Sequence, residues 1–275
     1  MPRLHLANIS RIFNPTALLA YRKTTIVADV AQNLSYLDSI HSDIDSYLKK
    51  TITIREPLSV FEPMHHLTFA TPKTTASALC VAACELVGGN REDAIVAASA
   101  IHLMHAAMYA HEHLLIKGRV GPKDIIPHQF GPNIELLIGD GILPFGFELL
   151  AGCNSASNNS EKILRVIIEI TRAMGAEGMI DDNQEIDPLI RQPSRQLHGC
   201  GAKCGAILGG GNDEEIERLK RYGVCIGKIQ RLLSEMEWNE RIKVESIEKL
   251  KVLALQELEN FDSKKVEQIS SIIGV

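Results

Sequence analysis

Apolar residues recur along most of this chain at steps of three and four positions. The segment that contains Leu37, Ile40, Ile44 and Leu48 shows the pattern clearly. Side chains at this spacing lie on one face of an α-helix, so the pattern predicts helices that bury one side. The same criterion predicts helices over Leu34–Lys49, Thr74–Val87, Asp93–Leu115, Ile134–Ala151, Lys162–Met174, Gln196–Leu208, Asp213–Glu237, Val244–Leu258 and Lys264–Ile273.

Strand signals are scarce in this sequence. Thr51–Ile54 alternates as a strand does, but it is too short to build a sheet, and no βαβ rhythm, P-loop or dinucleotide fingerprint occurs. Gly209–Gly211 follows no predicted strand, so we interpret it as a helix stop rather than a phosphate loop. Asn212 is predicted to cap the helix that follows. The fold class is therefore predicted to be all-α, an antiparallel helical bundle.

One long segment, Ala94–His111, contains no lysine, arginine, aspartate or glutamate. Its length is near the lower limit for a membrane span, roughly 17 residues. It is, however, rich in alanine and contains His102 and His105. We interpret it as a buried helix of a bundle and expect no membrane span.

The N-terminus has a composition of its own. Its first acidic residue is Asp29, and Arg3, Arg11 and Arg22 precede it together with several hydroxyl side chains. This composition is typical of an organelle transit peptide, and a merely disordered basic tail is the alternative. We predict a transit peptide or disordered N-terminus over residues 1–30 and a single all-α domain over residues 31–275.

Composition and charge exclude several classes of protein. The chain has 275 residues, 29 lysines and arginines against 34 aspartates and glutamates, and a net charge of −5. A nucleic-acid binder would need a basic patch, and six cysteines are too few for a disulfide scaffold at this length. The acids gather on predicted solvated helix stretches such as Asp213–Glu217, Glu245–Glu248 and Glu257–Asp262.

Two CxxxC motifs, each followed by a glycine pair, are the most unusual local features. They contain Cys80 and Cys84, and Cys200 and Cys204. Within a helix this spacing puts both sulfur atoms on one face. Three interpretations remain open: small apolar residues in a helix–helix seam, a paired small-residue face for a partner helix, and a four-thiol zinc site or thiol-binding module.

A second run, His105–His113, concentrates histidines around Glu112. His111 and His113 are two positions apart and point to different faces of a helix, and the HExxH zinc spacing is absent. Taken alone, the run is best interpreted as polar residues on an alanine-rich helix, with a metal site as the alternative.

Four segments together resemble a known family. CVAACELVGG from Cys80, HAAMYAHEH from His105, GDGILPFGFELLAG from Gly139 and CGAKCGAILGG from Cys200 resemble the trans-prenyltransferases, the all-α isoprenyl diphosphate synthases. The resemblance runs from about Leu34 to about Leu258 and implies an isoprenoid-synthase-type helical bundle. The CxxxC motifs resemble those of the plant small subunits of heteromeric geranyl(geranyl) diphosphate synthases.

The resemblance also implies where the metal site of an active enzyme would lie. Two Asp-rich motifs on facing helices would hold Mg²⁺, which neutralises the pyrophosphate leaving group. The first motif begins at Glu112 and His113, and the second at Ser234 and Glu235, so a single carboxylate stands at the start of each. Arg231 stands where the family has a glutamine.

The basic substrate motif of the family is also reduced. It corresponds to Thr71–Ala76, in which Lys73 is kept and both arginines are replaced. His105 stands at the family's isopentenyl-diphosphate histidine, so Lys73 and His105 are the retained substrate-site matches. The chain between Asp182 and Cys200 is shorter than the family pattern.

These departures suggest a function that is not catalytic. Charge stabilisation is usually the largest contribution to catalysis, and a multi-Mg²⁺ site should not assemble from two carboxylates. The resemblance therefore implies a regulatory small subunit that binds no metal or cofactor itself. It would pair with a catalytic geranylgeranyl diphosphate synthase large subunit, which holds Mg²⁺, as a heterodimer or heterotetramer in the plastid (chloroplast).

The resemblance also leaves choices open. Cys80, Cys84, Cys200 and Cys204 are the predicted subunit-interaction residues. The alternative from another class is an active short-chain prenyltransferase whose unusual metal ligands are Glu112, His113 and Glu235.

Overall fold

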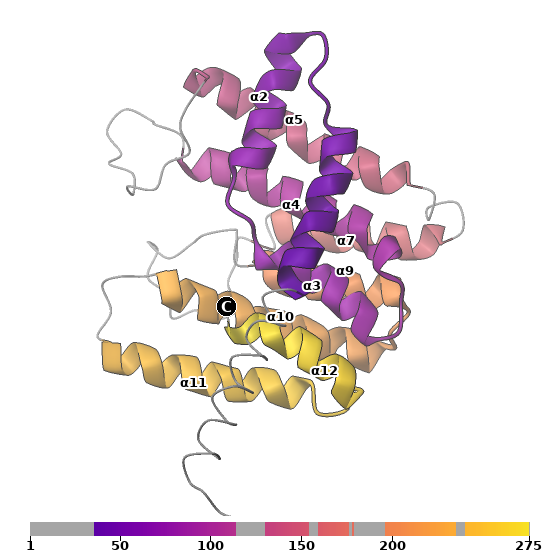
Figure 1. The fold of residues 1–275 in the computed structure, drawn as a ribbon, viewed down its shortest axis with the longest axis vertical. Coiled ribbons are helices and arrows are strands. Elements are labelled where there is room, and N and C mark those ends of the chain that lie inside the picture. The colour runs from indigo at the N-terminus through magenta and orange to yellow at the C-terminus, as the bar shows by residue number, and fades with distance from the viewer. Residues whose placement is uncertain are drawn as a thin grey trace, which may run out of the picture.

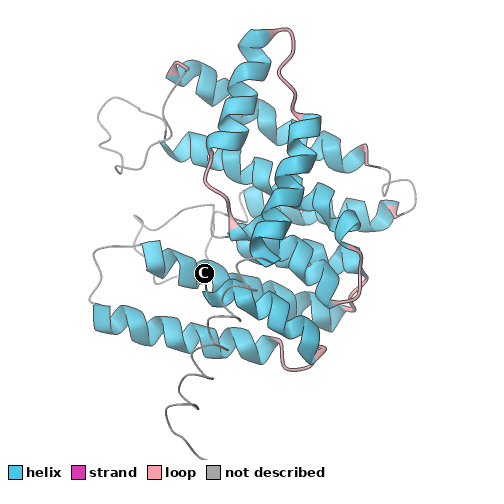
Figure 2. Ribbon diagram, viewed as in Figure 1, coloured by secondary structure: helices cyan, strands magenta, loops and turns pink. Residues whose placement is uncertain are grey.

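The computed structural model describes residues 36–113, 130–153, 159–175, 178, 196–234 and 240–274. A helix covers residues 36–51 and a 3-10 turn, Ser271–Gly274, follows the last α-helix. The other helices are α2 (Leu58–Ala70), α3 (Thr75–Leu86), α4 (Arg91–His113), α5 (Pro132–Ala151), α7 (Ser160–Met174), α9 (Gln196–Gly209), α10 (Asp213–Ser234), α11 (Glu240–Glu257) and α12 (Ser263–Ser270). No strand occurs within these described ranges, which confirms the predicted all-α class (Figure 2).

The helices form a bundle around α3, which packs against α9 and α4 (Figure 1). α9 also packs against α7 and α10, α4 against α5, and α11 against α10. Every α3 residue except Glu85 is buried, which is the pattern of a helix that is apolar all round and lies inside a domain. Because α3 and α9 contain the two CxxxC motifs, the helices that pack against them surround these motifs.

The predicted helices agree with the structure, except that one helix, α2, was missed. α2 was not predicted because Pro63 and two histidines obscure its pattern, yet it buries Pro63, Met64 and Leu67 on one face. Thr51–Ile54, whose alternation is too short to build a sheet, forms no strand: the first helix ends at Thr51 and the next three residues are irregular. Alternation over four residues cannot form a strand without a partner strand to pair with.

Some sequence predictions fall outside the described residues. These are the predicted transit peptide at residues 1–30, most of the shortened segment between Asp182 and Cys200, and the continuation of the α10 helix predicted beyond Ser234.

α4 is the one helix in the described part of the chain that is long and apolar enough to cross a membrane. Most of that apolar stretch is buried inside the bundle, including Ala100, Ile101 and Met104. It packs against α3 and α5. The prediction of a buried bundle helix is therefore confirmed.

Two local signals at the start of α10 behave as predicted. The Asn212 Oδ1 accepts the N–H of Glu215 at 3.0 Å, and the Asn212 N–H donates to the Glu215 carboxylate at 2.8 Å. This reciprocal pair is a capping box. Gly210 has a φ of +84°, a conformation that side chains disfavour, so the triple glycine ends α9 as expected.

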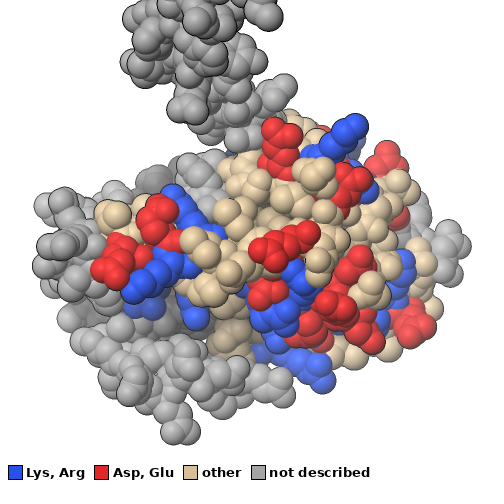
Figure 3. Space-filling model, turned by 90° about the horizontal axis from the view of Figure 1, so that it is seen from below, with Lys and Arg blue, Asp and Glu red and all other residues tan. Residues whose placement is uncertain are grey.

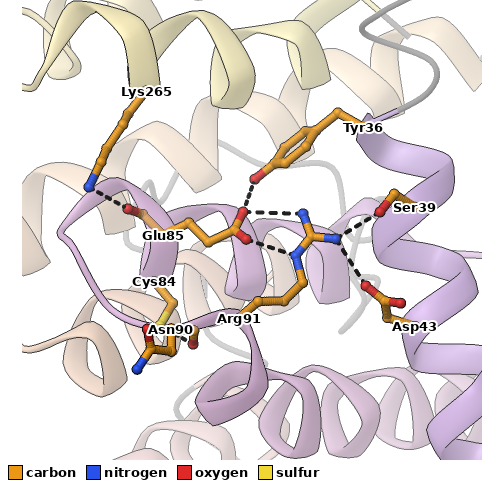
Figure 4. Close-up of polar contacts among 8 residues, drawn as sticks. All are labelled: Tyr36, Ser39, Asp43, Cys84, Glu85, Asn90, Arg91 and Lys265. Atoms are coloured by element: carbon orange, nitrogen blue, oxygen red, sulfur yellow. Dashed lines mark hydrogen bonds and ion pairs between the residues drawn. The ribbon is translucent and has the colours of Figure 1, made fainter.

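A polar network fixes the first helix to the bundle (Figure 4). Arg91 Nε donates to the Glu85 carboxylate at 2.7 Å, and Arg91 Nη1 donates to Ser39 at 2.8 Å and to Asp43 at 2.9 Å. Tyr36 donates to the same Glu85 carboxylate, and burial raises the pKa of Tyr36 well above its usual range. The network joins residues 36–51 to α3 and α4 at the end of the first CxxxC motif.

Charged side chains outside this network are mixed in sign. Figure 3 shows acidic and basic residues interspersed on the face seen from below. On α11, Lys249 pairs with Glu245 at 2.8 Å and Lys251 with Glu248 at 3.1 Å. The acids of this segment therefore lie on a solvated helix face, as predicted.

Candidate functional site

The retained substrate-site matches lie between the first helix, α3 and α4. Lys73 precedes α3 and pairs with Asp45 of the first helix at 2.6 Å. The pKa values of His41 and His102 are lowered, first of all by burial. The positive charge of Lys73 lowers both pKa values further. The structure thus brings Lys73 into the same region as the histidines of α4.

His105 lies on α4 beside other rings. Its ring centroid is 6.4 Å from that of His102 and 6.0 Å from that of Tyr109. His102 is buried and its Nε2 lies 3.0 Å from the Thr68 carbonyl oxygen, to which it donates. These contacts fix the α4 histidines within the bundle and leave Lys73 as the half-exposed cation of the region, with 48% of its side chain accessible.

The degenerate Asp-rich positions lie at helix ends. Glu112 is exposed near the end of α4, and Ser234 is exposed at the end of α10, where its hydroxyl donates to the Arg231 carbonyl at 2.8 Å. The side chain of His113 and all of Glu235 lie outside the described residues.

The described carboxylates do not assemble a Mg²⁺ site. Near Glu112, the carboxylate of Asp140 is 3.3 Å from His111 Nε2. Across the described ranges, no three histidine, cysteine, aspartate or glutamate side chains are arranged to hold a metal ion. Mg²⁺ prefers several hard oxygen ligands, which one glutamate and one serine hydroxyl do not provide. The described positions of the two motifs therefore do not fit the metal.

A partly buried polar cluster was missed by the sequence reasoning. The Thr75 hydroxyl donates to Gln230 Oε1 at 2.7 Å, and His198 Nε2 lies 3.1 Å from the same oxygen. These residues join α3, α9 and α10. The amide in this cluster belongs to Gln230. The sequence comparison had instead placed Arg231, the next residue, at the position of the family's glutamine.

Both CxxxC motifs lie in one seam between α3 and α9. A Cβ built on Gly201 would lie 2.1 Å from the Ala76 carbonyl oxygen, and one built on Gly205 would lie 1.9 Å from the Cys80 carbonyl oxygen. Such distances are far inside van der Waals contact, so the two helices touch backbone to backbone. The glycines between and after the cysteines set this close approach.

The glycine pairs that follow the motifs continue the same seam. A Cβ on Gly209 would lie 2.6 Å from the Cys84 carbonyl oxygen, and one on Gly89 would lie 2.4 Å from the Gly209 Cα. The repeated Cys-plus-glycine pattern in the sequence is thus the pattern of an intrachain helix pair.

The four sulfur atoms of the motifs are buried in that seam. Cys200 Sγ and Cys204 Sγ are 3.8 Å apart, and Cys204 Sγ lies 4.0 Å from the Val166 carbonyl oxygen of α7. Burial raises the pKa of Cys84 to about 12, and that of Cys80 rises for the same reason. The four thiols are free and are not arranged as a zinc site. The seam interpretation of the motif is the one the structure shows.

Exposed apolar residues lie on α5 and on α7, two helices that pack partly against each other. Leu137 of α5 is 64% exposed, and Leu164 and Ile168 of α7 are 58% and 40% exposed. We call these residues together the α5–α7 face; they are Ile134, Leu136, Leu137, Leu164 and Ile168.

The α5 part of the face carries little charge. The acids of this helix are Glu135, which is buried, Asp140, which pairs with His111, and Glu148. Covering the α5 part of the face therefore desolvates few ionised groups, whereas α7 also exposes Arg165 and Arg172.

The chain is similar to small subunits of heteromeric prenyl diphosphate synthases. No family model matches it. It is 45% identical over 259 residues to a protein of Cannabis sativa named heterodimeric geranylgeranyl pyrophosphate synthase small subunit 2, chloroplastic; the match covers 87% of this chain and 90% of the relative.

Solved structures give the same result. A geranyl diphosphate synthase small subunit from Antirrhinum majus is 50% identical, with a TM-score of 0.78 and coverage of 88% of this chain and 99% of that one. A chain of a deletion mutant of the heterotetrameric geranyl pyrophosphate synthase of mint is 48% identical, with a TM-score of 0.73 and coverage of 88% and 99%.

Proposed function

Because this chain belongs to the small subunits of heteromeric geranylgeranyl and geranyl diphosphate synthases, we propose that it is a non-catalytic regulatory subunit. It binds a catalytic large subunit and changes the product length or the activity of that subunit in terpenoid biosynthesis. The relative from Cannabis sativa is named chloroplastic, which places this chain in the plastid. The family and the helical bundle inferred from the sequence are confirmed.

The observation that carries the non-catalytic assignment is the reduced acid content of the described metal-motif positions. Glu112 remains at the first motif and the neutral Ser234 stands at the second. Pyrophosphate leaves an allylic carbon readily only when its charge is neutralised. The Mg²⁺ of the holoenzyme is accordingly assigned to the large subunit, and none to this chain.

The surviving basic residue supports the same conclusion. Asp45 already pairs with Lys73 at 2.6 Å, so a diphosphate would have to displace an internal carboxylate. Lys73 and His105 remain the substrate-binding candidates of this chain, and the ion pair reduces what Lys73 can offer an anion.

The large subunit is proposed to dock on the α5–α7 face. The sequence similarity to a chain of the mint heterotetramer supports a partner chain, and the exposed apolar residues of α5 and α7 offer it a surface whose α5 part carries few charges. The assembly is a heterodimer or a heterotetramer. The exposed apolar residues of α11 are a poorer candidate than those of α5, because lysine–glutamate pairs lie among them.

An assay of separate and mixed subunits tests the function. The purified chain with Mg²⁺, dimethylallyl diphosphate and isopentenyl diphosphate is expected to give no turnover above background, because its described motif positions do not form the metal site. Mixed with a large subunit, it is expected to change the ratio of geranyl to geranylgeranyl diphosphate or the total rate, read by chromatography of the products.

Two outcomes decide between this function and the alternative. Robust turnover by the lone chain would establish an active short-chain prenyltransferase, with Glu112, His113 and Glu235 as its candidate ligands. Identical product ratios and rates with and without the chain would remove the regulatory role.

The four cysteines are proposed to support association through the seam that they build. Replacing Cys80 and Cys84, or Cys200 and Cys204, with serine is expected to weaken co-purification with the large subunit about tenfold or more. A hydroxyl buried without a hydrogen bond costs roughly 1–3 kcal/mol, which loosens the α3–α9 pair. Matched alanine pairs, which bury no hydroxyl, are expected to have a smaller effect. Unchanged co-purification of both serine variants would refute the proposal.

A further inference from the structure

We propose that the second cysteine motif controls binding of the large subunit indirectly, by holding the inner side of α7 in place. Lys203 is the residue that positions this helix. The inference rests on the proposed function, in which α7 forms part of the partner surface. It explains how a motif buried inside one chain can govern association with another.

α7 has two distinct sides. Its inner side buries Ile163, Val166 and Ile170, while Leu164 and Ile168 point away from the core. A partner on the α5–α7 face would contact the outer side only. The position of the outer leucine and isoleucine therefore depends on what holds the inner side.

Three side-chain contacts from α7 to α9 run along that inner side. Lys162 Nζ donates to the Leu208 carbonyl at 3.1 Å, and Cys204 Sγ lies 4.0 Å from the Val166 carbonyl oxygen. One turn further, Lys203 Nζ pairs with Glu169 at 3.0 Å. Positions 162, 166 and 169 lie on one stripe of α7, because residues three and four apart share a helix face.

Lys203 is the only charged residue inside the second motif, Cys200–Cys204, and it bridges two helices. Besides Glu169 of α7, it contacts Glu217 of α10 at 3.2 Å, and only 14% of its side chain is exposed. Burial by itself lowers the pKa of Lys203, but the two carboxylates outweigh it and the pKa lies above its usual value. The lysine therefore stays charged and holds α7, α9 and α10 together.

Loss of this charge would leave Glu169 and Glu217 facing each other without the shared cation. Glu169 would keep its pair with Arg172 at 3.3 Å and Glu217 its pair with Lys220 at 3.8 Å. Each of these pairs lies within one helix, however, so the link that Lys203 makes between α7 and α10 would be lost. We expect α7 to loosen while the α3–α9 seam, held by its own backbone contacts, remains. The outer side of α7 would then present Leu164 and Ile168 less precisely to the partner.

The test compares Lys203→Met with Lys220→Met in the full chain. Methionine keeps an apolar stem of similar length and removes the charge. Lys220 is a matched control because it also pairs with Glu217, at 3.8 Å, but its side chain is 46% exposed. Lys203→Met is expected to raise the Kd for the large subunit about tenfold and to speed hydrogen exchange in α7, and Lys220→Met to change either quantity less than twofold.

Two further variants separate the possible outcomes. Lys203→Arg retains the charge and is expected to keep most of the affinity. Leu164→Asp with Ile168→Asp tests the partner surface itself. If the aspartates abolish binding while Lys203→Met leaves both affinity and α7 exchange unchanged, the positioning role is refuted and the proposed surface stands. If the aspartates also leave binding unchanged, the proposed surface fails and this inference fails with it.

Discussion

Replacing Gly205 with alanine is expected to lower the free energy of unfolding by about 3 kcal/mol, the upper part of the usual range for overpacking. The new Cβ would lie 1.9 Å from the Cys80 carbonyl oxygen and 2.8 Å from its carbonyl carbon. These are backbone atoms, so no side chain can rotate to make room, and α3 and α9 must separate. Denaturant unfolding of the isolated chain, followed by circular dichroism, measures the change.

Gly141→Ala is the matched control for this substitution. Gly141 also lies inside a helix, but nothing lies within 4 Å of a Cβ built there. Alanine favours a helix over glycine by roughly 0.5–1 kcal/mol, so this variant is expected to gain stability. If Gly205→Ala were as stable as Gly141→Ala, the backbone-to-backbone seam would be wrong.

Placing aspartates at both Leu164 and Ile168 is expected to weaken binding of the large subunit at least 100-fold, which corresponds to about 2.8 kcal/mol. The substitutions remove two apolar anchors and add charges that the interface would have to desolvate. Both residues are exposed on α7, so the stability of the isolated chain is expected to change by less than about 0.5 kcal/mol. Titration of the labelled large subunit measures the affinity.

Leu253→Asp controls for a general effect of added charge on an exposed helix. Leu253 is 51% exposed on α11, a helix that packs against α10. The Leu253→Asp variant is expected to bind the large subunit with the same affinity as the unaltered chain. Equal losses for the α7 and α11 variants would show that the partner does not select the α5–α7 face.

The helices themselves could be predicted from the sequence, since their signals are local. Apolar spacing located α7, α9 and α10, and Asn212 and the triple glycine marked helix ends correctly. α2 was missed because Pro63 is a helix breaker by propensity, and only burial against the bundle compensates for it.

The candidate site could be predicted only in part. The family resemblance predicts that Glu112 and Ser234 stand at metal-motif positions, and that the second of them lacks the expected acid. The ion-pair partner of Lys73 could not be predicted, because Asp45 is 28 positions away and no periodicity relates the two residues. Lys203 was also missed, since a lysine between two cysteines looks solvent-exposed until Glu169 and Glu217 are brought beside it.

The sequence by itself determined the helical class and the family, because residue types and helical periods are encoded locally. Only the tertiary structure decided what the CxxxC motifs do. Their spacing by itself is compatible with a seam, a partner face or a zinc site. The choice depends on the carbonyl oxygens of Ala76, Cys80 and Cys84 meeting the glycines of α9, more than a hundred positions away, and such contacts are fixed by packing of the whole bundle.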